Sequence, residues 1–510
     1  MGIFISNDAA KIVTPVKLSL ALPLAVIVFS FGYFVWLCIY NLYFHPLSKF
    51  PGPKLSAISR FPYSRLLISG EGHRDVLDLH LKYGPIVRIA PDFLSFSHPD
   101  AMNDIRGHRK AGQPEHRKDP IRQELHVTNI IGANRADHTR FRRSLANGFS
   151  HQAMLDQEPI IRDYVEELMK SLEKNGANGT QPIDMVRWFN YATFDIIGDL
   201  AFGESFGCLQ SSTYDPWVQL IFNSVKNLVY IGALKHLKIV PKRLLKFILP
   251  YTMPKGVSNK YAENQRLSAM KVKKRLETGS NRPDFMTSMT AKRNGESLTF
   301  EELTSNASIL IIAGSETTAT ALSAAAYYLG LFPEVQAKLA QEVRTTFNSA
   351  EDITITSVQH LTYMLAVLDE VMRMYPPVVS GLPRLTAEGG AMIAGEYVPE
   401  DTIVEVWQWP LFHNPNYWTQ PDDFIPERWL GDPKFANDRR ECFQPFSTGP
   451  RNCIGKNLAY SEMRLILARV IMQYDIKLAE GTEGWDDRSK TYSLWEKGPV
   501  NVYMIPRKVE

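Results

Sequence analysis

The stretch FSTGPRNCIG, residues 446–455, places one cysteine among two glycines, a proline and an arginine, in a chain with only four cysteines. A structural zinc site needs four ligands in paired spacing, and Cys442 lies eleven residues upstream with no neighbouring histidine. A nucleophile needs a base and an oxyanion hole, for which there is no local signature. A haem iron needs only one cysteine thiolate, because the porphyrin supplies the equatorial ligands. The stretch therefore predicts that Cys453 ligates a haem.

The residues around Cys453 suit a flat macrocycle. Gly449 and Gly455 would let the backbone pass close to its face and turn freely, and backbone amides aimed at the sulfur would tune its donor strength. Arg451 is a candidate partner for a propionate. A disulfide is disfavoured, since four unevenly spaced cysteines fit a reducing compartment.

A second decisive segment is residues 18–40, LSLALPLAVIVFSFGYFVWLCIY, which contains no charged side chain. About 20 apolar residues span a bilayer as a helix, so the segment predicts a transmembrane anchor after a short lumenal N-terminus, residues 1–17. A cleaved signal peptide is the alternative. It would have a shorter apolar region followed by small residues, whereas the aromatic YNLYFHPL follows here.

Three prolines, Pro46, Pro51 and Pro53, follow the apolar segment and predict a stiff hinge over residues 41–54. The remainder, residues 55–510, shows no repeat, low-complexity tract or second linker, and is predicted to be one large domain. The 57 basic and 54 acidic residues are too evenly balanced for a nucleic-acid-binding protein.

Helical patterning dominates the body. Apolar residues recur every three or four positions in residues 160–174 and 333–347, and short strands are predicted at residues 85–90 and 401–407. The fold class is therefore mainly α with small β-sheets. The basic, apolar segment 229–250 is either a second membrane contact or a set of surface helices.

The most unusual predicted helix begins after Thr299 and Glu302, which form a capping box, and ends before Pro333. It is apolar enough for the protein core, yet its middle reads AGSETT, residues 313–318. One interpretation is a local kink with Glu316 paired to a buried base. The other is a widened turn at Gly314, whose carboxylate and hydroxyl groups handle protons in a buried site.

These features converge on a known family. Phe446, Gly449, Arg451, Cys453 and Gly455 match F-x-x-G-x-R-x-C-x-G, the haem-binding signature of the cytochrome P450 monooxygenases. Three further marks stand in the family's order: AGSETT, then DEVMR with its E-x-x-R spacing, then PERW at residues 426–429. The resemblance covers nearly the whole chain and implies the P450 fold, a single domain behind an N-terminal transmembrane helix.

The resemblance assigns roles residue by residue. Glu316 and Thr317 are expected to deliver protons, and Glu370, Arg373 and Arg428 to form a buried cluster beneath the cysteine loop. Cys453 is the expected iron ligand of haem b, and the other expected haem contacts are Phe446, Gly449, Gly455, Arg451, Arg142, His138, Arg384, Ala313 and Gly314. His138 stands where the family often has tryptophan, an arrangement that resembles fungal members.

The blocks ADHTRFRRSLANGFS and TFDIIGDLAFGESFG look like fungal secondary-metabolism enzymes of the isotrichodermin hydroxylase kind. The resemblance thus implies a monooxygenase that hydroxylates or otherwise oxidises a lipophilic terpenoid or polyketide with O2 and electrons derived from NADPH. A haem-thiolate isomerase, dehydratase or desaturase is the first alternative. A non-catalytic haem- or sterol-binding membrane protein is the second, but it has no need for a polar gap in the central helix.

Partners and location follow from the same resemblance. The chain has no flavin domain and no G-x-G-x-x-G after a strand, so electrons are expected from NADPH–cytochrome P450 reductase, with cytochrome b5 as a second donor. Arg140, Arg143, Lys456 and Arg464 are candidate docking residues. The protein is expected to be monomeric and single-pass in the endoplasmic reticulum membrane, its domain facing the cytosol. Expected substrate contacts are the loop after Arg106, Ser308, Ile309, Ile312, residues 378–382 and residues 493–495.

Overall fold

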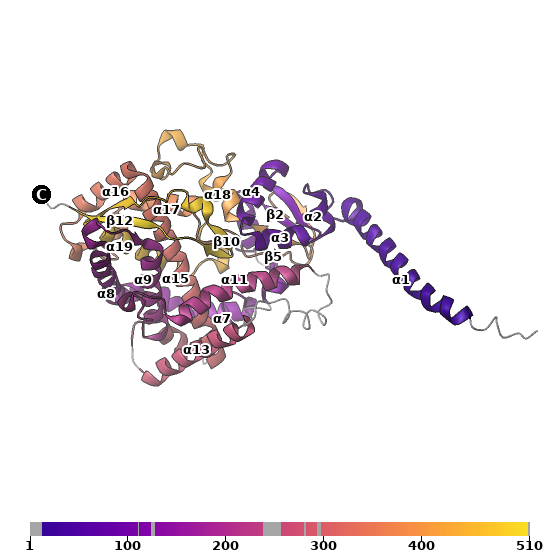
Figure 1. The fold of residues 1–510 in the computed structure, drawn as a ribbon, viewed down its shortest axis with the longest axis horizontal. Coiled ribbons are helices and arrows are strands. Elements are labelled where there is room, and N and C mark those ends of the chain that lie inside the picture. Colours follow the sequence, from indigo (N-terminus) through magenta and orange to yellow (C-terminus); the bar gives the residue numbers. More distant parts are fainter. Residues whose placement is uncertain are drawn as a thin grey trace, which may run out of the picture.

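Helices form most of the body and the sheets are small, as the hydrophobic periodicity predicted (Figure 1). The computed structural model describes residues 13–110, 112–123, 128–237, 257–279, 282–292 and 297–507. Residues 1–12 of the expected lumenal segment and residues 238–250 of the basic segment lie outside the described residues, so the proposed second membrane contact stays a prediction.

The helices and strands have the following bounds. The helices are α1 (Val13–Ile39), α2 (Lys54–Ile58), α3 (Phe61–Ser69), α4 (Gly72–Tyr83), α5 (Ala101–Arg106), α6 (Pro120–Gln123), α7 (Arg135–Ala146), α8 (His151–Gly176), α9 (Met185–Phe202), α10 (Cys208–Ser211), α11 (Pro216–His236), α13 (Val257–Thr278), α14 (Phe285–Thr290), α15 (Phe300–Leu331), α16 (Pro333–Thr346), α17 (Thr362–Met374), α18 (Gln408–His413), α19 (Lys456–Gln473) and α20 (Trp485–Arg488). The strands are β1 (Ile86–Ala90), β2 (Phe93–Phe96), β3 (Arg117–Lys118), β4 (Ile183–Asp184), β5 (Arg384–Leu385), β6 (Ala391–Ile393), β7 (Glu396–Val398), β8 (Ile403–Val406), β9 (Tyr474–Leu478), β10 (Lys490–Tyr492), β11 (Leu494–Glu496) and β12 (Asn501–Pro506).

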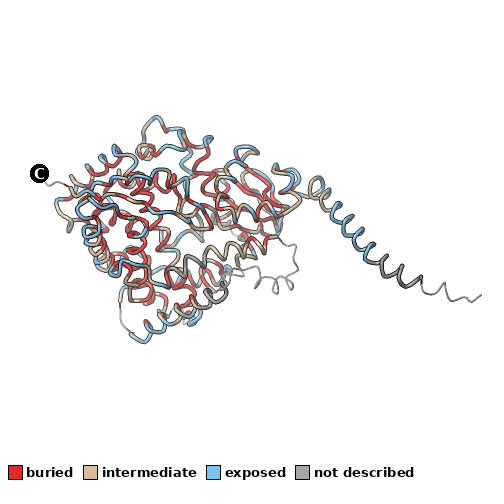
Figure 2. Tube along the Cα trace, viewed as in Figure 1, coloured by how far each residue is buried: buried red, intermediate tan, exposed pale blue. Residues whose placement is uncertain are grey.

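Helix α1 projects away from the body, and its side chains are exposed from Pro23 to Trp36 (Figures 1 and 2). Its segment Pro23–Phe44 has a mean hydropathy of 2.0 with none of its residues buried, which is long and apolar enough to cross a bilayer. Helical geometry continues as a π-turn through Phe44, four residues into the stretch expected to be a hinge, and ends at His45. Pro46 explains this end, because the residue before a proline is disfavoured in helical conformation.

Helix α15 passes through the centre of the body and packs along α9 (Figures 1 and 2). The predicted capping box is present: the Glu302 N–H donates to Thr299 Oγ1 at 3.2 Å, and the Thr299 N–H donates to Glu302 Oε2 at 2.9 Å. The helix is as apolar as a membrane span, but most of it is buried inside the protein. It is therefore a core helix, and it ends at Leu331, before Pro333, as predicted.

The expectation of a widened turn at Gly314 was wrong, because α15 is a continuous α-helix from Phe300 to Leu331. The hydroxyls of Ser315 and Thr317 donate back to the carbonyls of Ile311 and Ala313, both at 2.6 Å, and leave the helix closed. Gly314 serves close packing instead. A β-carbon there would lie 2.7 Å from Ile197 Cδ1 on α9.

The largest sheet has the strand order β1-β2-β8-β5-β3. Strands β2 and β8 pair in parallel, and the other neighbours pair antiparallel. Two of its strands, β1 and β8, are those that the sequence predicted. Strands β3 and β5 matter most for the site, because they carry Lys118 and Arg384 to one edge of the sheet.

Candidate active site

Cys453 lies in the loop between a 3-10 turn, Gly449–Arg451, and the start of α19. The Cys453 N–H donates to the Phe446 carbonyl oxygen at 2.9 Å, which closes the loop. Gly449 has φ +76, and a β-carbon at this position would overlap the Arg106 carbonyl oxygen. Only glycine therefore fits, and the loop is held against α5 at the residue that the signature requires to be glycine.

The Cys453 side chain is exposed on one side, while the surrounding protein still raises the pKa of its thiol by burial. A hydrogen bond from the Gly455 N–H and the nearby charges of Arg142 and Lys456 act in the opposite direction. Arg142 is fixed by the same loop, since it donates to the carbonyl oxygen of Asn452 at 2.8 Å and to its side-chain oxygen at 2.6 Å. The sulfur thus has donors and cations around it and one open side, as a metal-ligating thiolate requires.

A group of cationic side chains gathers beside this loop. Arg451 pairs with Glu115 and donates to the Ala133 carbonyl oxygen at 3.0 Å. Arg384 is buried and donates to the carbonyl oxygen of Leu382 at 3.2 Å. The sequence analysis predicted Arg451 and Arg384 as haem contacts, but it did not indicate which other charged side chains lie beside them.

The charge that the sequence did not reveal is Lys118, at the end of β3. Burial and, next, the positive charges of Arg384, Arg451 and Arg106 lower the pKa of Lys118 to about 6, and Glu115 opposes them. Among the described residues around it, three arginines and the amine of Lys118 thus face a single carboxylate. A strand of only two residues gives no periodic signal, so only the tertiary structure identified Lys118.

His138 on α7 is buried in the same region. Burial lowers the pKa of His138 to about 4, followed by the charges of Arg451, Lys118 and Arg142. The imidazole is therefore neutral near neutral pH and can donate one hydrogen bond. A cofactor carrying two carboxylates would neutralise the excess positive charge of this group, so the residues present fit the propionates of a haem.

The structure also brings Glu370 and Arg373 of α17 together with Arg428 in the turn Pro426–Trp429. Arg373 Nη2 and Arg428 Nε lie 2.9 and 3.0 Å from Glu370 Oε1, and all three side chains are completely buried. Asp438, which the sequence did not indicate, also pairs with Arg428. Two arginines and two acids balance the charge, which a buried ionic cluster needs in order to be stable.

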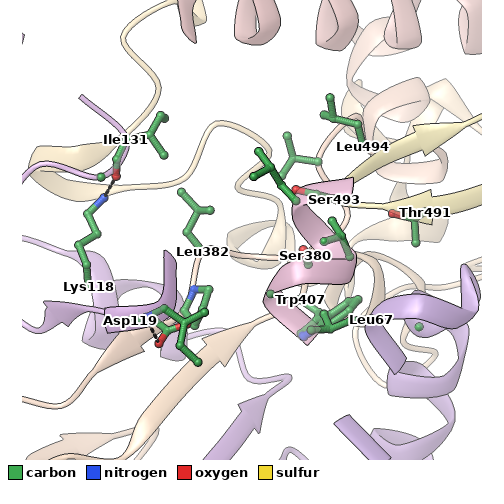
Figure 3. Close-up of a pocket in the computed structure, with 18 of the residues that line it drawn as sticks. Leu67, Lys118, Asp119, Ile131, Ser380, Leu382, Trp407, Thr491, Ser493 and Leu494 are labelled. Atoms are coloured by element: carbon green, nitrogen blue, oxygen red, sulfur yellow. Dashed lines mark hydrogen bonds between the residues drawn. The ribbon is translucent and has the colours of Figure 1, made fainter. Parts of the chain in front are cut away.

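A cavity of about 300 Å³ lies against α15 (Figure 3). Helix α15 contributes Ile309, Ile312, Ala313 and Thr317 to its wall. The expected substrate contacts that also line it are Val378, Ser380, Leu382, Ser493 and Leu494. Two expected substrate contacts, Ser308 and Trp495, do not line the cavity. Both are buried, and the Trp495 indole N–H donates to the Pro376 carbonyl oxygen at 2.8 Å.

Glu316 does not share this wall. Its carboxylate forms a buried ion pair with Lys497, and Thr320 Oγ1 lies 3.4 Å from its Oε1. In the described part of the chain, Glu316 Oε2 has no hydrogen-bond partner. The buried base that the kink interpretation required is therefore present, whereas Thr317 of the same motif reaches the cavity.

Comparison with known proteins decides the family. The cytochrome P450 family model matches residues 53–504. This chain is a cytochrome P450. It is 53% identical over 480 residues to the trichothecene C-15 hydroxylase of Fusarium sporotrichioides, covering 93% of this chain and 96% of that protein. It is 44% identical to the cytochrome P450 monooxygenase tpeC of Talaromyces stipitatus, covering 96% and 95% of the two chains. It is 42% identical to the averantin hydroxylase of Dothistroma septosporum, covering 92% and 89%.

The P450 assignment confirms the predicted fold class, the single domain and the enzyme class: the protein is a P450 monooxygenase. The family implies a haem-thiolate cofactor and electrons from a redox partner. It also makes α1 a possible membrane anchor of this P450.

Proposed function

We propose that this P450 hydroxylates a lipophilic fungal metabolite of the trichothecene class. The observation that carries the proposal is the 53% identity to a trichothecene C-15 hydroxylase over almost the full length of both chains. The mostly apolar cavity beside α15 supports it, since such a wall favours a compact hydrocarbon skeleton with few polar groups.

In this proposal Cys453 holds the haem iron, and Arg142, Arg384, Arg451, Lys118 and His138 hold its propionates. Phe446, Gly449, Gly455, Ala313 and Gly314 complete the haem contacts. The bound haem supplies O2 activation, and a thiolate ligand favours O–O cleavage. The apolar wall from α15 and from the residue 378–382 turn excludes bulk water and orients the C–H bond to be oxidised.

Thr317 is the proposed proton-handling residue. Its hydroxyl donates to the Ala313 carbonyl oxygen at 2.6 Å, so its oxygen lone pairs are available to hold a water in the cavity. Glu316 is paired with Lys497 and would have to break this ion pair to reach the same water. We propose that Glu316 turns from Lys497 toward the cavity and there passes protons to the water. Catalysis then needs both residues of the motif, one at the wall and one behind it.

Electrons are proposed to come from NADPH through cytochrome P450 reductase, with cytochrome b5 as a second donor. Arg143 and Lys456 are exposed and suit an acidic partner surface. Arg140 is already paired with Glu302 and Asp137, and Arg464 lies over the Tyr460 ring. We therefore assign docking mainly to Arg143 and Lys456. The anchor is proposed to lie in the endoplasmic reticulum membrane with the catalytic domain in the cytosol.

The purified full-length enzyme, supplied with reductase, NADPH and O2, should add one oxygen atom to at least one member of a trichothecene panel. Mass spectrometry of the products, run beside a polyketide panel of similar size, tests this expectation. Oxygenation confined to polyketides would contradict the substrate class. Absence of a red-shifted Soret band when CO is added to the reduced enzyme would contradict the haem-thiolate site.

Thr317→Ala should retain haem and substrate binding but release most of the consumed NADPH electrons as peroxide, because the water at the cavity wall loses its acceptor. The measurement is the ratio of hydroxylated product to NADPH consumed, with peroxide quantified in parallel. Ser323→Ala is the matched control, since Ser323 makes the same hydrogen bond to the fourth preceding carbonyl but is fully buried. A Thr317→Ala ratio equal to that of the wild type would contradict the role.

A further inference from the structure

Lys497 is the first residue after the short antiparallel hairpin formed by β10 and β11. The tip of this hairpin, Ser493 and Leu494, lines the cavity (Figure 3). The Lys497 side chain does not line the cavity. It pairs with Glu316 of α15, and only 4% and 3% of the two side chains are exposed. The hairpin that forms part of the cavity wall therefore ends in a buried cation that holds an acid of the central helix.

The chain is held by hydrogen bonds on both sides of this lysine. Two residues before it, the Trp495 indole N–H donates to the Pro376 carbonyl oxygen at 2.8 Å. One residue after it, the Gly498 carbonyl oxygen accepts from the Trp485 indole N–H, also at 2.8 Å. The lysine side chain thus starts from a fixed point of the backbone and is buried along its length. We therefore expect the ion pair to separate through movement of Glu316.

The surroundings of Glu316 make its charge depend on Lys497. Among the described residues, Lys497 is the one cation that pairs with it. Two phenols, Tyr214 and Tyr375, also interact with its charge. They stay neutral, because burial chiefly, and the charge of Glu316 in addition, raise the pKa of both hydroxyls. A buried carboxylate in such a place stays ionised only while a cation neutralises it, since an unpaired charge away from water is costly.

We propose that Lys497 is a positioning residue that stores Glu316 as a carboxylate behind the cavity wall. The inference deepens the proposed function and rests on it, because it concerns the regulation of the proton supply assigned to Glu316. While no substrate is bound, the ion pair keeps the acid away from the cavity and slows the reduction of O2 by NADPH electrons. Without the lysine, Glu316 takes up a proton from solvent and, as a neutral carboxylic acid, reaches the water held by Thr317 more easily.

The first test is infrared spectroscopy of the purified, haem-loaded full-length enzyme. Lys497→Met should show the absorption of a buried protonated carboxyl group, and this absorption should be missing from the double variant Lys497→Met/Glu316→Gln. The wild type, compared with Glu316→Gln, should show carboxylate absorption only. Lys497→Arg restores a cation and should match the wild type. A protonated Glu316 in the wild type, or an ionised one in Lys497→Met, would overturn the inference.

The second test measures NADPH consumption with reductase and O2 but without any substrate. Lys497→Met should consume NADPH several-fold faster than the wild type, and Lys497→Arg at the rate of the wild type. Lys226→Met is the matched control, because it removes the cation that pairs with Glu496, the residue before Lys497. That pair is 36% and 54% exposed, so the rate should not change. Equal rates in the wild type and Lys497→Met would overturn the inference.

The double variant distinguishes this inference from the proposed function. Lys497→Met/Glu316→Gln should return to the wild-type rate of NADPH consumption. A double variant as fast as Lys497→Met would overturn the proton-supplying role of Glu316, and the inference with it. If Lys497→Met does not fold, Lys497→Gln replaces it in both tests, because an amide also leaves the carboxylate without a cation. Inactivity on trichothecenes would count against the proposed substrate class alone, since neither measurement uses a substrate.

Discussion

Cys453→Ser should abolish the thiolate-type spectrum and monooxygenase activity together. A serine hydroxyl is a far weaker acid than a thiol and a harder ligand, so the iron would lose the strong electron donor on this side of the haem. The loop itself should survive, because the hydrogen bond that closes it comes from the backbone N–H of residue 453 and not from its sulfur. The measurement is the CO-difference spectrum of the reduced protein, with haem content determined separately.

Cys442→Ala is the control for this experiment. Cys442 is buried and unpaired, eleven residues upstream of Cys453, and its removal takes away a thiol without touching the loop. It should retain the red-shifted Soret band. Persistence of that band in Cys453→Ser, or its loss in the control alone, would refute the ligand assignment.

Glu370→Gln should destabilise the protein by about 3–5 kcal/mol and lower the yield of haem-loaded enzyme. Glu370 accepts from Arg373, from Arg428, from the Ile425 N–H at 3.0 Å and from the Trp429 indole at 2.9 Å. The amide keeps the shape of the side chain, but among the described residues it leaves the two completely buried arginines with Asp438 as their one acidic partner. The midpoint of thermal unfolding, measured together with haem content, reports the change.

Glu396→Gln is the matched control, because it makes the same substitution in an ion pair with Lys49 that is about half exposed on both sides. Exposed pairs contribute about 1 kcal/mol or less, so its unfolding midpoint should barely move. Equal shifts in the two variants would show that burial of the Glu370 cluster adds nothing to stability.

The sequence by itself determined the family and the fold class, and it predicted the cysteine ligand. These features are local, because each can be recognised from consecutive residues. They are a loop with glycines at fixed spacing, a capping box and an uncharged apolar segment. The capping box at Thr299 and the end of α15 before Pro333 appeared where the sequence placed them, because backbone hydrogen bonding at helix ends depends mostly on nearby residues.

The tertiary structure alone decided which side chains meet. It turned Glu316 toward Lys497 and left Thr317 at the cavity, although the two are adjacent in the sequence. It also brought Lys118 to the arginines and Asp438 to Arg428. It brought Asp119 close to His236, which lies more than a hundred residues further along the chain. No periodic or short-range pattern in the sequence predicts these contacts, because the distance between the two side chains of each pair depends on how whole helices and strands pack. Charge and cavity shape therefore became visible only in the folded chain, where burial makes each unmatched charge costly.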